Sequence, residues 1–193
     1  ASLRRHVGPA AGCRAAAVNI AFVGGFGMAP KRTMPSRALP LARQLVARGH
    51  SVTILLPPWD HSADSGRIWT EDGVRVVNLP LPPGLPLAWY PWLGLRLLRA
   101  TLALRPDVVH VFKPKGFSAF VAQALLAGQA AGRHRNLRVV VDTDDWEGVG
   151  GWNDIEPYPA WQKALFAHQE QWLLRHAPAA TCASRELVRM AQA

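Results

Sequence analysis

The chain has 193 residues, of which 49% are hydrophobic and 18% are charged, so it can bury a core of ordinary domain size. This composition excludes intrinsically disordered and fibrous proteins, and the length leaves room for one compact domain or for one half of a larger enzyme. The 22 Lys and Arg residues outnumber 13 acids and give a net charge of +9. Such a charge favours anionic partners, such as nucleotide phosphates, lipid headgroups or nucleic acid.

The two cysteines, Cys13 and Cys182, lie far apart and outside any Cys-x-x-Cys spacing. The sequence therefore predicts neither a disulfide framework nor a zinc site, and we expect a reducing, cytoplasmic setting. Residues 1–16 carry arginines but no apolar run of the kind that a secretory signal needs. We expect them to form a flexible basic tail ahead of a single domain over residues 17–193.

Short β-branched runs alternate with segments of helical periodicity along the chain. The first half predicts a strand at 18–23, a glycine loop at 24–27, a helix at 35–48, a strand at 51–56, a loop at 57–73 and a strand at 74–79. The second half predicts a helix at 88–104, a strand at 107–112, a helix at 118–131 with Ser118 as its N-cap, a strand at 138–142, a helix at 160–176, a strand at 179–182 and a helix starting at 184.

This alternation is typical of an α/β fold in which a doubly wound parallel sheet is covered by helices on both faces. In such Rossmann-like sheets, ligands bind outside the carboxyl ends of the strands. Four predicted loop segments meet there, and they are the places to look for chemistry: 24–34, 59–67, 113–117 and 143–152.

The glycine loop after the first strand is one candidate site. Its glycines allow close approach of the backbone to a ligand, and two cations follow before the helix. The predicted phosphate-binding residues are Gly24, Gly25, Gly27, Lys31 and Arg32. A tight turn that binds nothing is the alternative. The loop is neither a Walker motif nor a dinucleotide fingerprint, since Pro30 stands where a third glycine should pack and the next strand ends without an acid.

The second candidate is an acidic segment at the end of the strand at 138–142. Carboxylates can orient a hydroxyl or a base, and indole rings stack on the C–H face of a sugar. We predict a catalytic role for Asp144 and Asp145, and acceptor binding by Trp146, Glu147 and Trp152. A solvated acidic loop is the alternative. The Asp-Thr-Asp triplet also resembles the metal site of GT-A glycosyltransferases, but we predict no metal here.

Two further features, His110 and residues 85–105, allow either a functional or a structural interpretation. His110, inside an apolar strand, is either a core residue or a catalytic residue that faces the cleft. Residues 85–105 combine Trp, Tyr and Arg side chains but are too charged and too interrupted by Pro and Gly to span a bilayer. They either rest on an anionic membrane surface or form a helix packed on the sheet.

Three passages together resemble the N-terminal, acceptor-side domain of a GT-B glycosyltransferase of family 4. The first joins the glycine loop of Ile20–Gly27 to the passage Arg37–Leu55, which contains Arg-Gly-His between a helix and a strand. The second is Arg105–Val111, similar to the family's strand that enters the cleft. The third, Ala179–Leu187, resembles its closing strand and the Ser-x-Glu-Leu start of a helix.

The resemblance implies transfer of a sugar, of hexosyl type, from a nucleotide-sugar donor to a carbohydrate or lipid-linked acceptor, usually with retention and without a required metal or other cofactor. In the family the glycine loop lies against the donor diphosphate. A second Rossmann-like domain binds most of the nucleotide, and this chain does not contain it. We therefore expect the chain to form half of a cleft and to be inactive alone, at the inner face of a membrane or free in the cytoplasm.

The chain also departs from the family pattern. Many relatives follow the cleft strand with a second His and a Glu, where this chain has Phe112 and Lys113. We therefore predict that Asp144 or Asp145 positions the acceptor hydroxyl, and that Lys113 and Lys115 bind the acceptor, one or the other meeting an anionic group. The alternatives are an NAD-type oxidoreductase domain, which would lack its ribose-binding acid, and a basic module that binds lipid or nucleic acid. No nucleic-acid motif is present, so we expect no nucleic-acid partner.

Overall fold

The computed structural model describes residues 16–82, 86–148 and 150–192, and in the helix that begins at Pro86 it describes side chains from Pro91 onward. Within these residues, seven strands form one sheet in the order β3-β4-β2-β1-β5-β6-β7. Neighbouring strands are parallel, except that β3 and β4 pair antiparallel at one edge. The strands are β1 (Asn19–Val23), β2 (Ser51–Leu56), β3 (Ile68–Glu71), β4 (Val74–Asn78), β5 (Val108–Phe112), β6 (Arg138–Thr143) and β7 (Ala179–Cys182).

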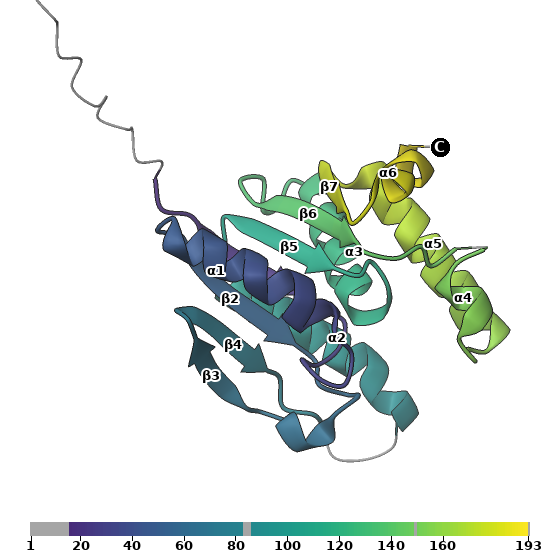
Figure 1. Ribbon diagram of the computed structural model, residues 1–193, viewed down its shortest axis with the longest axis horizontal. Helices are drawn as coiled ribbons and strands as arrows, with labels where there is room; N and C mark the ends of the chain where they lie inside the picture. Colours follow the sequence, from purple (N-terminus) through teal and green to yellow (C-terminus); the bar gives the residue numbers. More distant parts are fainter. Residues whose placement is uncertain (1–15, 83–85, 149, 193) are drawn as a thin grey trace, which may run out of the picture.

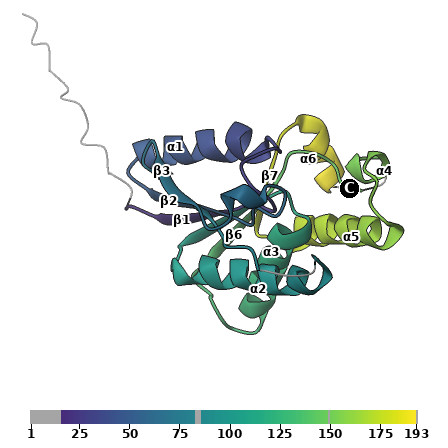
Figure 2. The ribbon, with the colours of Figure 1, turned by 90° about the horizontal axis from the view of Figure 1, so that it is seen from below.

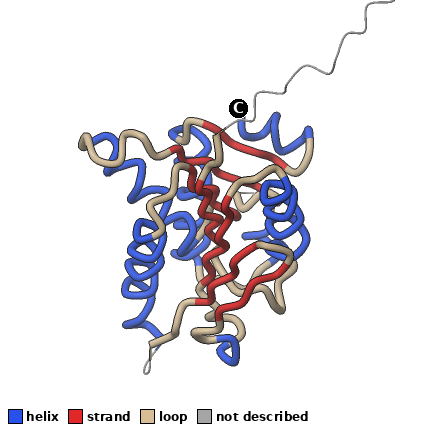
Figure 3. The backbone as a smooth tube through the Cα atoms, turned by 90° about the vertical axis from the view of Figure 1, so that its left-hand side faces the viewer, coloured by secondary structure: helices blue, strands red, loops and turns tan. Residues whose placement is uncertain are grey.

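Helices cover both faces of the sheet: α1 lies on one face, and α2, α3 and α5 lie on the other (Figures 1 and 2). Figure 3 shows the strands as the layer between these helices. The helical segments are the π-helical turn η1 (Met34–Ala38), α1 (Leu39–Ala47), the 3-10 turn η2 (Ser62–Asp64), α2 (Pro86–Ala103), α3 (Gly116–Ala130), α4 (Trp152–Ile155), α5 (Ala160–His176) and α6 (Arg185–Gln192). The predicted α/β, doubly wound, Rossmann-like fold is confirmed.

Two apolar cores flank the central strands. Successive residues of a strand point to opposite faces, so Phe22 of β1 enters the core under α1, whereas Val23 enters the core under α2 and α3. Because helices cover both faces, β1, β2, β5 and β6 are buried over most of their length. No helix in the described part of the chain is long and apolar enough to cross a membrane.

The chain reverses its winding direction between β1 and β5. These strands are neighbours, but the segment after β1 leads to α1 on one face, and the segment after β5 leads to α3 on the other. The loops that follow the two strands therefore separate, and a crevice opens at the carboxyl end of the sheet. The fold places the glycine loop on one side of this crevice.

The structure corrects three sequence-based predictions. Residues 68–71, predicted inside a loop, form the antiparallel edge strand β3. The helix predicted over 35–48 is divided into η1 and α1. Ser118 is not an N-cap but lies inside α3, fully buried, where its hydroxyl donates to the carbonyl oxygens of Lys113 and Lys115. The tail predicted at 1–16 falls almost entirely outside the described residues.

Gly24 marks the end of β1 and leaves no room for a side chain. A Cβ atom there would lie 2.6 Å from Leu56 Cδ2 and 2.9 Å from Met34 Sδ. Because overpacking a core typically costs about 1–3 kcal/mol, we expect Gly24→Ala to lower the free energy of unfolding by that amount in urea titrations. Gly128→Ala in α3 is the matched control, since its nearest neighbour would be 3.5 Å away and Ala favours a helix. Equal stability of the two variants would contradict this account.

Candidate functional site

A cavity of ≈ 270 Å³ opens at the carboxyl end of the sheet, between the glycine loop and the acidic turn. It is lined by Phe26, Lys31, Arg32, Thr33, Lys113, Lys115, Asp145, Trp152 and Glu156. The two turns also touch directly, since the Thr33 hydroxyl donates to Asp144 Oδ2 at 2.9 Å. The prediction that these two segments face each other across one groove is therefore confirmed.

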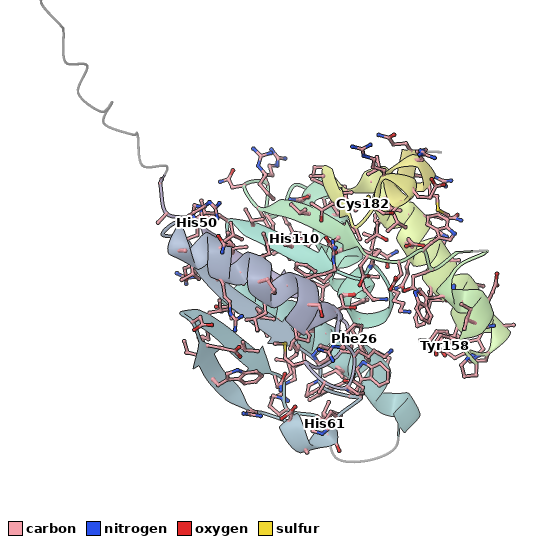
Figure 4. All side chains as sticks on the ribbon, in the orientation of Figure 1. Phe26, His50, His61, His110, Tyr158 and Cys182 are labelled. Carbon is pink, nitrogen blue, oxygen red and sulfur yellow. The ribbon has the colours of Figure 1, made fainter. Side chains whose placement is uncertain are left out.

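A smaller cavity of ≈ 40 Å³ continues this groove toward α3 and α5. Gly25 and Trp59 line it on the side of the glycine loop, and Tyr158 lines it on the opposite side. Figure 4 shows Phe26 and Tyr158 toward the end of the sheet where the strands β1 and β5 terminate. The groove thus extends from the cationic segment after β1 to the start of α5.

The glycine loop is held by its own contacts. The Gly24 amide donates to Leu55 O at 3.0 Å, and the Gly27 amide donates to Asp60 Oδ1 at 2.9 Å. The Trp59 indole N–H donates to the Gly25 carbonyl at 2.7 Å. Two of the three glycine amides predicted to bind phosphate are therefore already paired, and this part of the prediction is corrected. Gly25 lines the smaller cavity and remains placed to meet a ligand.

Lysines that follow β5 bind the acidic turn that follows β6. The ammonium of Lys113 lies 2.5 Å from Asp145 Oδ2, 3.5 Å from Glu147 Oε1 and 3.6 Å from Asp144 Oδ1. Lys115 pairs with the other oxygen of Glu147 at 2.7 Å. Three carboxylates thus surround two ammonium groups, so neither lysine carries spare positive charge. Both lysines line the cavity, so the prediction that Lys113 or Lys115 meets an anionic group of a ligand stays a prediction, with carboxylates of this chain already paired to both.

Burial and ion pairing shift the pKa values of the charged groups in this cluster in different directions. Burial lowers the pKa of Lys113, but Asp144, Asp145 and Glu147 outweigh it and the net pKa is raised. Burial also lowers the pKa of Lys115, and there it prevails. The pKa of Asp144 is raised by burial, whereas the hydrogen bond and charge of Lys113 hold that of Asp145 below its usual range. Asp145, which lines the cavity, thus has a lowered pKa that favours its ionised form, whereas that of Asp144 is raised.

His110 lies among the strands of the sheet (Figure 4) and lines neither of these two cavities. Its ring is buried, stacks against Phe112 with centroids 4.5 Å apart, and has Nε2 3.2 Å from Thr181 Oγ1. Burial lowers the pKa of His110 to about 4, so the ring is neutral at physiological pH. The catalytic interpretation is corrected in favour of the core alternative, because the ring has no access to the groove.

A buried ion pair that the sequence did not reveal lies beside His110. Arg37 binds both oxygens of Asp142, at 3.0 and 2.6 Å, and Thr181 donates to Asp142 Oδ2 at 2.6 Å. Asp142 is therefore occupied by protein donors and is not available with Asp144 to hold a cation. Among the described residues, no cluster of three or more His, Cys, Asp or Glu side chains could hold a metal ion.

Besides the two lysines, three residues were predicted to bind an acceptor, and they have different positions. Trp152 lines the main cavity, which leaves its acceptor role a prediction, and its hydrogen bond to Asp145 helps to lower the pKa of that carboxyl. Glu147 is buried and paired with both lysines, so it supports the turn and does not face a ligand. Trp146 lines a separate cavity with residues of α5 and α6. The predictions for Glu147 and Trp146 are corrected accordingly.

The sequence analysis also missed Glu170, which holds the acidic turn in place through two hydrogen bonds. Its carboxylate accepts the Glu147 amide at 2.9 Å and the Thr143 hydroxyl at 3.1 Å. An acid on a helix is usually solvated, so no sequence signal distinguishes it. Asp60, in contrast, lies in the 59–67 segment that the sheet topology singles out, and its role in holding the glycine loop follows from that position.

This arrangement is a Rossmann-like sheet with an open groove at its topological switch point. The chain resembles two solved structures at 16% identity, which shows the fold alone. The first is a putative UDP-N-acetylglucosamine 2-epimerase from Listeria monocytogenes, with a TM-score of 0.54 over a match that covers 92% of this chain and 41% of that one. The second is the catalytic domain of starch synthase IV from Arabidopsis thaliana, bound to ADP and acarbose, with a TM-score of 0.51 over a match that covers 68% of this chain and 35% of that one. The chain thus spans about two-fifths of the length of these proteins.

The family itself is shown by sequence. Residues 33–193 match the model of the glycosyl transferase 4-like domain, so the chain belongs to that family. No curated protein matches the chain. The family assignment agrees with the resemblance carried by the glycine loop, the cleft strand and the closing strand, and it does not favour an oxidoreductase domain.

Glu170 makes the stability of the site depend on pH. Burial raises the pKa of its carboxyl to about 7 from an ordinary value of 4.5. A carboxyl with a raised pKa in the folded state stabilises the fold below pH 4.5, and this stabilisation is lost as the pH rises toward 7. We expect Glu170→Gln to remove this loss in urea titrations repeated over that pH range. Glu186→Gln, an exposed control on α6, should keep the wild-type dependence; an unchanged dependence in Glu170→Gln would refute the assignment.

Proposed function

We propose that this chain is the acceptor-side domain of a glycosyltransferase that moves a hexosyl group from a nucleotide-sugar donor to an acceptor. The groove between the glycine loop and the acidic turn carries the proposal, because it offers cations on one wall and an ionised carboxylate on the other. A second Rossmann-like domain binds most of the nucleotide. The domain described here closes the cleft over the donor phosphates and holds the acceptor.

Lys31 and Arg32 take the phosphate-binding role in this proposal. Neither forms an ion pair with a carboxylate within the described residues, and both line the main cavity. The Lys31 ammonium lies over the Phe26 and Trp59 rings, at 5.1 and 5.4 Å from their centroids. These rings hold the cation in place without neutralising it, which suits a site for a diphosphate.

Asp145 positions the acceptor hydroxyl, while Asp144 supports the turn. Asp145 lines the cavity and is kept ionised, so it can accept a hydrogen bond from a sugar or alcohol hydroxyl. Asp144 is mostly buried, accepts from Thr33 and does not line the cavity. Trp152 offers its ring, 41% exposed, to the face of a sugar beside Asp145.

Donor cleavage tests the proposal. In the complete polypeptide, we expect release of UDP or ADP from UDP-glucose, UDP-N-acetylglucosamine or ADP-glucose when an acceptor is present. Loss of a hydrogen bond to a charged group costs about 1.5–3 kcal/mol, so Lys31→Ala should lower kcat/KM about 10- to 100-fold. Lys163→Ala is the matched control because this lysine lines neither cavity.

The outcomes separate the candidate functions. Absence of nucleotide release from all three donors, or equal activity of the two lysine variants, would refute the proposal. Quenching of tryptophan fluorescence by NAD and not by these donors would favour the oxidoreductase alternative. The resemblance to family 4 further implies that the sugar is transferred with retention at the anomeric carbon and that the chain alone has no turnover. The stereochemistry of the product tests the first implication, and assays of the chain with and without its second domain test the other.

We also propose that α2 meets an anionic membrane surface. Trp92 and Leu95 are exposed on this helix, and the Arg96 guanidinium lies 4.8 Å from the Trp92 ring centroid. The part of the predicted segment before Pro91 has no described side chains. An exposed Trp beside Arg is suited to the headgroup region of a bilayer.

Sedimentation with vesicles tests this surface. We expect Trp92→Ala to reduce binding of the chain to vesicles that contain phosphatidylglycerol, and raised salt to reduce it further. Ile68→Ala, which removes an exposed apolar side chain from the edge strand β3, is the control. Equal binding by wild type and Trp92→Ala would contradict a membrane role for α2.

A further inference from the structure

A second, apolar groove lies on the other side of the loop that begins α3. It has a volume of ≈ 400 Å³, within the range of about 300–1,000 Å³ that small-molecule sites occupy. Its lining residues come from helices α2, α3 and α5. Aromatic and aliphatic side chains provide most of the lining, together with three glutamines, and no charged side chain lines it. The groove is therefore suited to an uncharged, apolar ligand.

Large apolar side chains stay exposed at this groove. Trp161, Leu165 and Phe120 are 64%, 43% and 40% exposed, although all three line it. Single exposed apolar residues are common on proteins, but several around one hollow mark a place where another molecule binds. On the wall formed by α2, Gly94 has no side chain, and a Cβ atom there would lie 3.1 Å from the Phe120 ring. The glycine thus lets α2 and α3 pack closely at the edge of the groove.

The apolar groove adjoins the polar one and shares part of its lining. Gly116, Phe117, Gln162 and Phe166 line both the apolar groove and the ≈ 40 Å³ cavity that contains Lys31 and Lys115. The boundary between them is sharp, because the Lys115 ammonium lies 5.6 Å from the centroid of the Phe166 ring. A single molecule can therefore place a polar end beside Asp145 and Lys31 and an apolar chain between α2, α3 and α5.

We propose that this groove holds the alkyl or prenyl chain of the acceptor, so that the acceptor is an amphiphile whose hydroxyl-bearing or sugar-bearing end enters the cleft. The inference deepens the proposed function and rests on it. The shared lining favours such a chain over a partner protein, because it places the apolar groove directly beside the cleft in which the acceptor's polar end would lie. The absence of charge in the lining excludes a headgroup as the occupant of this groove.

Homologous alkyl ligands test the groove without any donor. Butyl, hexyl and octyl β-glucosides are titrated into the 193-residue chain by calorimetry, each below its micellar concentration. Burial of a methylene group strengthens binding by up to about fourfold, so affinity should rise steadily with chain length. Leu165→Gln should weaken octyl glucoside binding about tenfold and butyl glucoside binding much less. The side chain is partly exposed, so the variant should fold normally.

Leu41→Gln is the matched control, since Leu41 is 39% exposed on α1, on the opposite face of the sheet. Wild-type affinities in this variant support the proposal. Affinity that does not depend on chain length, or equal losses in both leucine variants, overturns it. If the complete polypeptide cleaves the donors but glucoside affinity does not rise with alkyl chain length, the proposal for the apolar groove is wrong and the proposed function stands. If affinity rises with chain length but no donor is cleaved, the proposed function is wrong and the groove remains a site for alkyl chains.

Discussion

The ammonium of Lys113 holds the end of β5 against the acidic turn after β6, and the shape of the cleft depends on this contact. Three carboxylates within one turn would otherwise repel one another, and a mostly buried ammonium would lack a partner. A buried charge without its partner costs several kcal/mol, so each half of the cluster requires the other. Glu170 and Lys115 extend the same arrangement by fixing Glu147 from two sides.

This neutralisation decides which residues remain for a ligand. Lys113 and Lys115 belong to the turn, so the cationic character of the cleft comes from Lys31 and Arg32 on the opposite wall. Aromatic rings hold Lys31 without cancelling its charge. Asp145 shares the ammonium of Lys113 yet still lines the cavity. One wall of the cleft is thus suited to bind phosphate oxygens and the other to bind a hydroxyl. The proposed sugar transfer requires both, because the donor carries phosphates and the acceptor carries the hydroxyl.

The helices behind the sheet have two roles. The inner faces of α2, α3 and α5 complete the core around Val23 and Leu125, and their outer ends surround the apolar groove. The start of α3 borders both the polar and the apolar groove, and Gly116 there has a φ of +61° while its amide donates to Gln169 at 2.8 Å. The proposed acceptor site therefore depends on a backbone geometry that glycine adopts readily.

The sequence alone determined the order of strands and helices, the doubly wound sheet and the four loop segments at its carboxyl edge, because hydrophobic periodicity and short-range turn signals are local. It also placed the glycine loop opposite the acidic turn, since parallel strands bring their carboxyl ends together. The edge strand at 68–71 escaped notice because its exposed, mixed side chains carry no strong alternation.

Only the tertiary structure decided which polar groups are free to act. Sequence could not show that Lys113 is paired, that His110 is buried or that Glu170 reaches the acidic turn, because each contact joins residues more than 20 positions apart. The same holds for the apolar groove, whose walls come from three helices. Whether a side chain serves the core, an ion pair or a ligand depends on the packing of distant segments, and that packing is fixed only when the whole chain folds.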